Sequence, residues 1–367
     1  MAEKPGNKVL ARRRAQEPDA GQIDGRRWLS FPRLAVLLLA AIAVAIIGDQ
    51  ALGATGPLSG SDLVAQAGRS FGDRFLNVVV DGLVVGLIIA LTSVGLSLIF
   101  GVTGLVNFAH GELVTFGAVV AWFLNAGTWG FQVTLAVAAL IAVVAGGLFG
   151  AALEKGVFGP LRKRKVPNIS LIVTTIGLSL VVRHVILIWY GSQTQKYRDY
   201  ATQVAKNYGP VSITDVKLAI IVISALVLAL VGLLLMKTRL GTAMRAVADN
   251  RDLAEASGID VRKVILATWA GGGALAALGG VFQGIGFAGV SWDLGFKLLL
   301  LMFAAVILGG LGTAFGAMVG GVLIGVVTQI SSLWLSTEFK LVIAFGILII
   351  VLLVRPQGIL GKKERIG

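Results

Sequence analysis

The segment GVTGLVNFAHGELVTFG, residues 101–117, places polar side chains in the middle of strongly apolar sequence. Asn107, His110 and Glu112 lie within six positions, and glycines stand around them at positions 101, 104, 111 and 117. An ionisable side chain at membrane depth costs about 2.5 to 3.5 kcal/mol on insertion scales unless it faces protein or water. Glycine permits close backbone approach and left-handed backbone conformations. The segment therefore predicts a helix break beside a pathway through a membrane protein.

The composition agrees with a membrane protein. The chain of 367 residues is 56% hydrophobic and only 14% charged, with a mean hydropathy of +0.87. Soluble domains carry about 25% charged residues, so we expect an all-α, polytopic membrane protein. The sequence has no cysteine, which excludes disulfides, a thiolate nucleophile and cysteine-bound metal. Its two histidines, His110 and His184, are too few for a histidine-rich metal site.

Ten apolar runs approach the roughly 20 residues that a bilayer-spanning helix needs. Glycines separate two late runs, which form either two short spans or one re-entrant hairpin whose backbone protein must cover. We therefore expect about 8–10 transmembrane helices. The runs lie at 34–52, 76–100, 108–126, 132–153, 168–190, 217–236, 264–288, 297–311, 314–334 and 340–354.

Basic residues are concentrated outside these runs. Most of the 32 lysines and arginines lie in the segments 1–33, 154–167, 237–263 and 355–367. The positive-inside rule assigns such segments to the cytoplasm, so both chain termini are expected there. The net charge of +13 thus follows membrane topology and does not indicate nucleic-acid binding.

The first 52 residues are expected to be an addition to the membrane domain. Residues 1–33 form a basic tail that is expected to be cytoplasmic and to touch anionic membrane lipid. The apolar run that follows is similar to the core of a signal peptide, but the tail before it is long and the candidate cleavage site at 54–56 is weak. We expect residues 34–52 to be retained as an extra transmembrane helix.

The loop at 237–263 alternates charged and apolar residues at nearly helical spacing. This pattern predicts a short amphipathic helix over 242–258, with Gly258 at its C-terminus. Three interpretations are open for a helix of this kind on the cytoplasmic side. It lies on lipid headgroups, it is a solvated connector, or it docks into a groove of a soluble partner.

Four motifs follow one another along the chain: NFAHGE at 107–112; GTAMRA at 241–246 with Asn250, Arg251, Ala254 and GIDV at 258–261; LGGLGT at 308–313; and RPQG at 355–358. Together they resemble the permease subunits of bacterial branched-chain amino-acid ABC transporters, the LivH type. The similarity runs from about residue 76 to the end and leaves the N-terminal 75 residues outside it. The stretch LAEASG at 253–258 keeps the glycine of the general ABC-permease loop signature but not its acidic start.

The resemblance implies an ABC importer permease fold over 76–358, with a cytoplasmic tail at 359–367, in a bacterial cytoplasmic membrane. It implies that the chain forms half of a transmembrane pathway and pairs with a second, LivM-type permease. Two ATPase subunits and an extracytoplasmic substrate-binding protein would complete the importer. The substrates would be branched-chain amino acids, or urea and short-chain amides, whose permeases are very similar. A self-sufficient secondary transporter or channel is the alternative from another class.

The chain is expected to be a transport subunit and not an enzyme. It lacks the phosphate-binding motif G-x-x-x-x-G-K-[ST], so we expect no cofactor on this chain and ATP with Mg²⁺ on the partner ATPases. The resemblance makes the loop at 237–263 the element that couples ATPase closure to the membrane. The residues expected to carry this coupling are Arg245, Asp249, Arg251, Glu255 and Gly258.

Asn107, His110 and Glu112 are the candidates for the substrate pathway. They lack the nucleophile or third metal ligand that catalysis or metal binding would need. They either bond the exposed backbone at the helix break, line the pathway and contact substrate, or relay protons in a secondary transporter. Arg183 and His184, near the outer end of another span, are expected to snorkel to the membrane interface.

Overall fold

A computed structural model describes residues 71–126, 132–200, 203–287, 289–336 and 339–361. These residues belong to the second of two units of the chain, Ile46–Gly367. The predicted cytoplasmic tail at 1–33 and the extra helix at 34–52 lie outside the described residues, as do the last residues of the predicted C-terminal tail.

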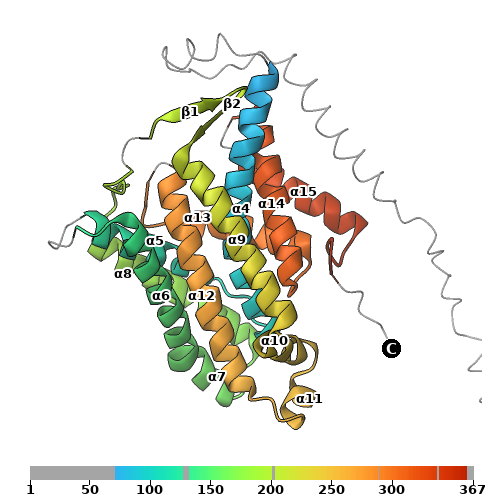
Figure 1. The fold of residues 1–367 in the computed structure, drawn as a ribbon. Helices are drawn as coiled ribbons and strands as arrows, with labels where there is room; N and C mark the ends of the chain where they lie inside the picture. The colour runs from blue at the N-terminus through green and yellow to red at the C-terminus, as the bar shows by residue number, and fades with distance from the viewer. Residues whose placement is uncertain (1–70, 127–131, 201–202, 288, 337–338, 362–367) are drawn as a thin grey trace, which may run out of the picture. The chain divides into compact units, whose positions relative to one another are not determined.

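Each predicted apolar run from residue 76 onward is a helix (Figure 1). Within the described ranges, six helical stretches are long and apolar enough to cross a membrane, whereas α13 and α15 are shorter. The all-α prediction is thereby confirmed. The helices are α4 Phe71–Thr103, α5 His110–Ala126, α6 Leu135–Leu153, α8 Asn168–Tyr190, α9 Asp215–Lys237, α12 Val261–Gly286, α13 Leu294–Gly309, α14 Ala314–Ser331 and α15 Lys340–Val354.

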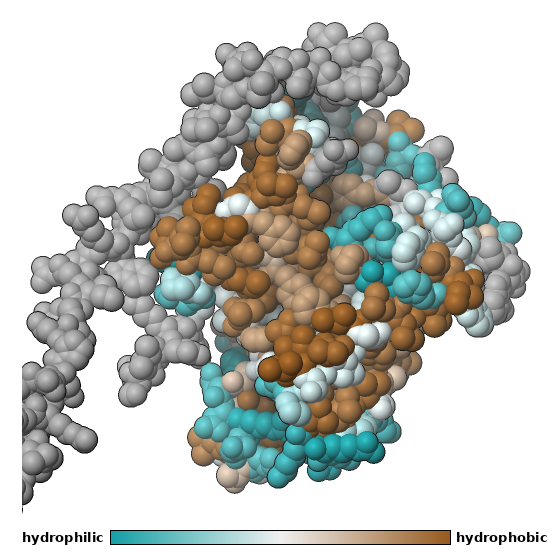
Figure 2. Space-filling view, turned by 180° about the vertical axis from the view of Figure 1, so that it is seen from behind, coloured by the Kyte–Doolittle hydropathy of each residue, from teal (hydrophilic) through white to brown (hydrophobic). Residues whose placement is uncertain are grey.

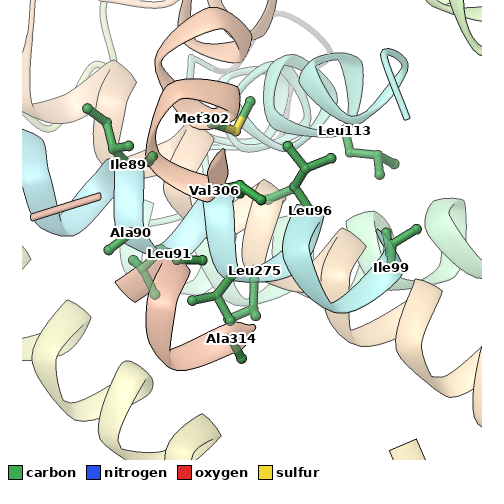
Figure 3. Close-up of a cluster of buried hydrophobic side chains, with 14 of the residues drawn as sticks. Ile89, Ala90, Leu91, Leu96, Ile99, Leu113, Leu275, Met302, Val306 and Ala314 are labelled. Atoms are coloured by element: carbon green, nitrogen blue, oxygen red, sulfur yellow. The ribbon is translucent and has the colours of Figure 1, made fainter. Parts of the chain in front are cut away.

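Helix α4 is the centre of the packing. In its most apolar 18-residue stretch 78% of the residues are buried, against 28% for α8 and for α9. Helices α12, α13 and α14 all pack against it. Figure 3 shows side chains of α4, among them Ile89 and Leu96, surrounded by Leu113, Leu275 and Met302 of its neighbours. Helices α8 and α9 instead leave most of their apolar surface exposed, as helices that face lipid do.

Small residues allow this packing. A Cβ atom built on Gly86 of α4 would lie 2.8 Å from the carbonyl oxygen of Val322 in α14, which is closer than real contacts allow. Between α4 and α12, a Cβ atom built on Gly95 would lie 2.7 Å from the carbonyl oxygen of Gly272. Close approach at small residues is a common basis of helix association in membranes, because lipid provides no hydrophobic driving force between helices.

Two segments between the predicted apolar runs contain short helical turns or strands. Helix α6 continues through a π-helical turn, η1 Glu154–Phe158, into α7 Gly159–Lys163. The loop after α8 contains an antiparallel hairpin of β1 Ala205–Tyr208 and β2 Val211–Thr214, in which Tyr208 pairs with Val211. This hairpin is the part of the described chain that departs from an all-α fold.

The hairpin is fastened to α4. Asn77 of α4 donates to the carbonyl oxygen of Pro210 at 3.1 Å and accepts from the amide of Ser212 at 2.7 Å. One helical turn further on, Asp81 forms an ion pair with Lys217 of α9 at 2.6 Å. Figure 1 shows the hairpin at one end of the helices and α7, α10 Arg239–Asp249 and α11 Arg251–Ala256 at the other.

Candidate functional site at a helix break

The predicted helix break lies between α4 and α5. Helix α4 ends at Thr103, Gly104 has a positive φ of 66°, and α5 begins at His110. The side chain of Asn107 accepts from the amide of Ala109 at 3.0 Å, so it caps the start of α5 as Asn and Asp side chains often do. The break predicted from the glycines and polar residues of this segment is confirmed.

His110 ties the break to α4. Its side chain is fully buried, and its Nε2 atom lies 3.0 Å from the carbonyl oxygen of Thr92. A carbonyl oxygen only accepts, so Nε2 carries the proton of this bond. The nearby Gly95 leaves room for the ring, because a Cβ atom there would lie 3.2 Å from the imidazole carbon Cε1.

Glu112 is held by a buried ion pair with Arg183. The Nε and Nη2 atoms of Arg183 lie 3.0 and 2.9 Å from Oε1 of Glu112, and the hydroxyl of Ser179 donates to the same oxygen at 2.8 Å. The guanidinium also stacks over Phe296, 3.7 Å from the ring centroid. These contacts join α5, α8 and α13, which offsets part of the cost of removing both charges from water.

The expectation that Arg183 snorkels to the interface is wrong. Its side chain is 10% exposed and that of Glu112 only 1%, because Arg183 turns inward to pair with the Glu112 carboxylate. The side chain of His184 is exposed, and its Nδ1 atom lies 2.7 Å from the carbonyl oxygen of Leu180 in the same helix, so its position at the interface stays a prediction. Ser179 and Phe296 were not predicted at all. An arginine within an apolar run is itself a signal, because such residues normally have a partner at membrane depth.

Each of the three predicted pathway residues keeps one polar atom without a partner. Within the part of the chain that the structure describes, Nδ2 of Asn107, Nδ1 of His110 and Oε2 of Glu112 are buried and make no hydrogen bond. Buried polar groups are normally satisfied, so these three atoms retain unused hydrogen-bonding capacity at the break. In the described ranges no group of three potential ligands could hold a metal ion. The arrangement is suited to hydrogen bonding.

The loop predicted to couple to the ATPases forms two helices and not one. Helix α10 ends at Asp249, Asn250 is extended with φ −157°, and α11 begins at Arg251. The physical reason is Asn250, whose side chain accepts from the amide of Leu253 at 3.0 Å and caps α11. Gly258 has φ +86° after α11, which confirms that the helical segment ends there.

The five predicted coupling residues divide into two groups. Arg245 donates to the carbonyl oxygen of Leu235 in α9 and so ties α10 to the bundle. Arg245 and Asp249 line a cavity of about 250 Å³. Arg251, Glu255 and Gly258 are exposed around α11, where they are accessible to a partner.

The cavity beside α10 is lined by glycines from two turns of the bundle, which we call the glycine turns. Its walls include Gly101 at the end of α4 and Gly312 in the turn between α13 and α14. These turns touch, since a Cβ atom on Gly101 would lie 2.9 Å from the carbonyl oxygen of Gly312. Met244 of α10 lines the same cavity and is buried. Helix α10 thus contacts the place where the helix break begins.

Asp260 is the N-cap residue of helix α12. Oδ1 of Asp260 accepts from the amide of Lys263 at 3.1 Å. The amide and then the ammonium of Lys263 hold the pKa of Asp260 below its ordinary value. The carboxylate therefore stabilises the junction between the coupling loop and a long helix near neutral pH.

Comparison with known proteins agrees with this architecture. Residues 78–352 match the family model described as branched-chain amino acid transport system / permease component. The chain is 32% identical over 305 residues to the high-affinity branched-chain amino acid transport system permease protein LivH of Salmonella typhimurium, covering 79% of this chain and 96% of LivH. Identity to BraD of Pseudomonas aeruginosa is also 32% over 305 residues, covering 79% of this chain and 97% of BraD.

An archaeal relative extends this range. The probable branched-chain amino acid transport permease protein LivH of Methanocaldococcus jannaschii is 30% identical over 291 residues, covering 75% of this chain and 89% of that protein. No solved structure matches the chain. The family model covers well over half of the chain, and the resemblance seen in its four motifs is confirmed. The chain belongs to the family of branched-chain amino acid transport system permease components.

Proposed function

We propose that this chain forms half of the transmembrane pathway of an ABC importer for branched-chain amino acids. The observation that carries the proposal is the family match over residues 78–352, together with relatives named as branched-chain amino acid permeases. The complete importer would contain a second, LivM-type permease, two ATPase subunits that bind ATP and Mg²⁺, and an extracytoplasmic substrate-binding protein.

The orientation follows from charge. The basic segments 154–167 and 237–263 contain α7, α10 and α11, which lie together at one end of the helices (Figure 1). We assign this end to the cytoplasm of a bacterial cytoplasmic membrane, with both termini on the same side. The hairpin end would then face the substrate-binding protein.

ATPase closure would be transmitted to the membrane helices through α10 and α11. The exposed residues Arg251, Glu255 and Gly258 would contact an ATPase subunit, while Arg245 binds α10 to α9. Because α10 shares a cavity with both glycine turns, a shift of α10 would act directly on the segment that leads to Asn107. Substrate would pass mostly small and apolar side chains near Asn107, His110 and Glu112, and the binding protein would supply selectivity.

Reconstitution of the whole importer tests this function. Proteoliposomes containing both permeases and the ATPases, with binding protein outside, should accumulate labelled leucine only when ATP is enclosed. An ATPase variant that binds but does not hydrolyse ATP is the matched control and should abolish uptake. Uptake of urea or acetamide in place of leucine would reassign the substrate. Leucine uptake that follows a proton gradient without ATP would overturn the proposal in favour of a secondary transporter.

A further inference from the structure

A basic crevice lies at the α7 end of the molecule, outside the residues discussed so far as a pathway. It has a volume of about 340 Å³ and is formed by η1 and α7, the start of α12, and α11. The ionisable side chains that line it are one acidic residue, Glu154, and five basic residues, Lys155, Arg162, Lys163, Arg251 and Arg262.

The positive charge of this crevice is largely uncompensated. Glu154 forms an ion pair with Arg162, and in the described residues both Nη1 of Arg162 and Oε2 of Glu154 are buried without a hydrogen-bond partner. In the part of the chain that the structure describes, no carboxylate forms an ion pair with Lys155, Lys163 or Arg262. Basic side chains gathered around a concave site attract an anion, and guanidinium groups suit phosphate oxygens in particular.

The π-helical turn creates this arrangement. The amide of Gly159 bonds to the carbonyl oxygen of Glu154, five residues earlier, so the chain makes one wide turn before α7. A Cβ atom on Gly159 would lie 2.9 Å from that same oxygen. Glu154, at the start of this turn, and Arg162, in the helix that follows it, form the ion pair and line the crevice together. Turns of this type recur at functional sites.

Apolar surface continues from the crevice along α6. Val144, Leu148 and Lys155 are spaced by four and seven residues, so they share one face of the helix. Val144 is 63% exposed and Leu148 is 67% exposed. Leu266 of α12 adds an apolar side chain to the crevice wall. Figure 2 shows a hydrophilic band at this end of the described chain and hydrophobic surface next to it.

We propose that this crevice binds the phosphate headgroup of an anionic phospholipid, whose acyl chains lie along the exposed face of α6. The combination of a cationic cavity with adjoining apolar helix surface fits a lipid, since an acidic protein surface would not need the apolar face. Basic pockets of this kind at the cytoplasmic ends of membrane helices are suited to anionic headgroups. Lys155 and Arg262 flank the phosphate from opposite walls of the crevice, which are η1 and the start of α12.

The test uses the assembled importer in phosphatidylcholine nanodiscs that contain a minority of phosphatidylglycerol. Mass spectrometry of the intact complex counts the retained phosphatidylglycerol. The double variant Lys155→Gln/Arg262→Gln should weaken retention roughly thirtyfold, because each basic residue near the membrane surface contributes about a fivefold effect. The matched control Lys237→Gln/Arg239→Gln removes two exposed charges at the same end, outside the crevice, and should retain lipid like the wild type.

Other outcomes would overturn the proposal. Equal retention by the double variant and the wild type would show that the crevice does not hold the lipid. Displacement of phosphatidylglycerol by inorganic phosphate would show a site for free phosphate. If the double variant keeps its lipid but loses ATPase subunits on size exclusion, the crevice is a protein contact. Neither variant alters Arg245, Asp249, Arg251, Glu255 or Gly258, but Lys237, Arg239 and Arg262 lie in the loop 237–263. ATPase association and leucine uptake are therefore measured for both variants beside lipid retention.

Discussion

The helix break at Gly104 and the pair α10–α11 both carry charged side chains, but they use them in opposite ways. At the break, Glu112 and Arg183 are enclosed and satisfy one another between three helices. On α11, Arg251 and Glu255 face outward from the bundle. Enclosed charges contribute to a unique arrangement of helices and are expensive to disturb, whereas exposed charges contribute little until a partner arrives. Variants of the two regions should therefore differ in both size and kind of effect.

The largest effect is expected when one member of the buried pair is removed. Arg183→Met leaves the Glu112 carboxylate buried without its counter-ion, which costs about 3–5 kcal/mol in comparable cases. We expect loss of folded permease in the membrane and a strongly lowered thermal midpoint of the purified importer, measured by fluorescence-detected size exclusion. Adding Glu112→Gln should restore much of the stability. A single Arg183→Met variant as stable as the wild type would show that the pair is not enclosed in the assembled protein.

A smaller loss is expected from crowding the centre of the bundle. Gly86→Ala forces a methyl group against the backbone of Val322, and overpacking of this kind costs about 1–3 kcal/mol. The control is Gly346→Ala in α15, where no atom lies within 4 Å of the new Cβ. Thermal melts of both importer variants should show destabilisation for Gly86→Ala only. Equal midpoints would mean that α4 and α14 separate without cost.

A still smaller effect, confined to coupling, is expected at the end of α11. Gly258 has φ +86° with open space around it, so Gly258→Ala is disfavoured by backbone strain of about 1–2 kcal/mol. Gly258→Asn should be milder, because Asn tolerates positive φ better. We expect weaker ATPase association in pull-down assays and lower leucine uptake. Both losses should be larger for Gly258→Ala than for Gly258→Asn, and the thermal midpoint of the permease should be unchanged. Loss of the folded permease would instead assign Gly258 to the bundle.

The smallest effect concerns pH. The pKa of Asp260 is lowered in the folded protein by its bonds from Lys263, so its stabilising contribution is present above the ordinary aspartate pKa and is lost as pH falls through the lowered value. The junction of the coupling loop with α12 should loosen only in acid, below about pH 4. Amide exchange at residues 261–264 should increase there in the wild type and not in Asp260→Asn. An increase between pH 6 and 8 would contradict this assignment.

Much of the fold follows from sequence because hydrophobic runs and glycine breaks are local signals. The helices from residue 76 onward and the break at Gly104 were predicted in this way. The pair of Glu112 with Arg183 was not, since it joins residues 71 positions apart and hydropathy carries no information on which helices are neighbours. The hairpin at 205–214 was hidden in a polar loop, and the π-turn after α6 is a backbone feature without a clear residue signature.

The division of the segment 242–258 into α10 and α11 also could not be predicted from hydrophobic periodicity. The helical period over 242–258 continues across Asn250, so periodicity alone predicts one helix. The asparagine is nevertheless a good cap, and its side chain bonds the amide of Leu253. The cap formed by Asn250 is therefore the reason why the segment forms two helices and not one. The coupling role of Arg251, Glu255 and Gly258 stays a prediction, whereas the inward turn of Arg245 could not be predicted without the position of α9.

Helix α4 has a mechanical consequence for the importer. Its attachment to the hairpin is at Asn77, and its contact with the opposite glycine turn is at Gly101. At 1.5 Å per residue these points are about 36 Å apart, and no proline interrupts the helix between them. In the orientation proposed above, a displacement imposed on the hairpin would reach the glycine turn along this one helix. The binding protein and the ATPases would then communicate through the length of one helix, without an intermediate joint.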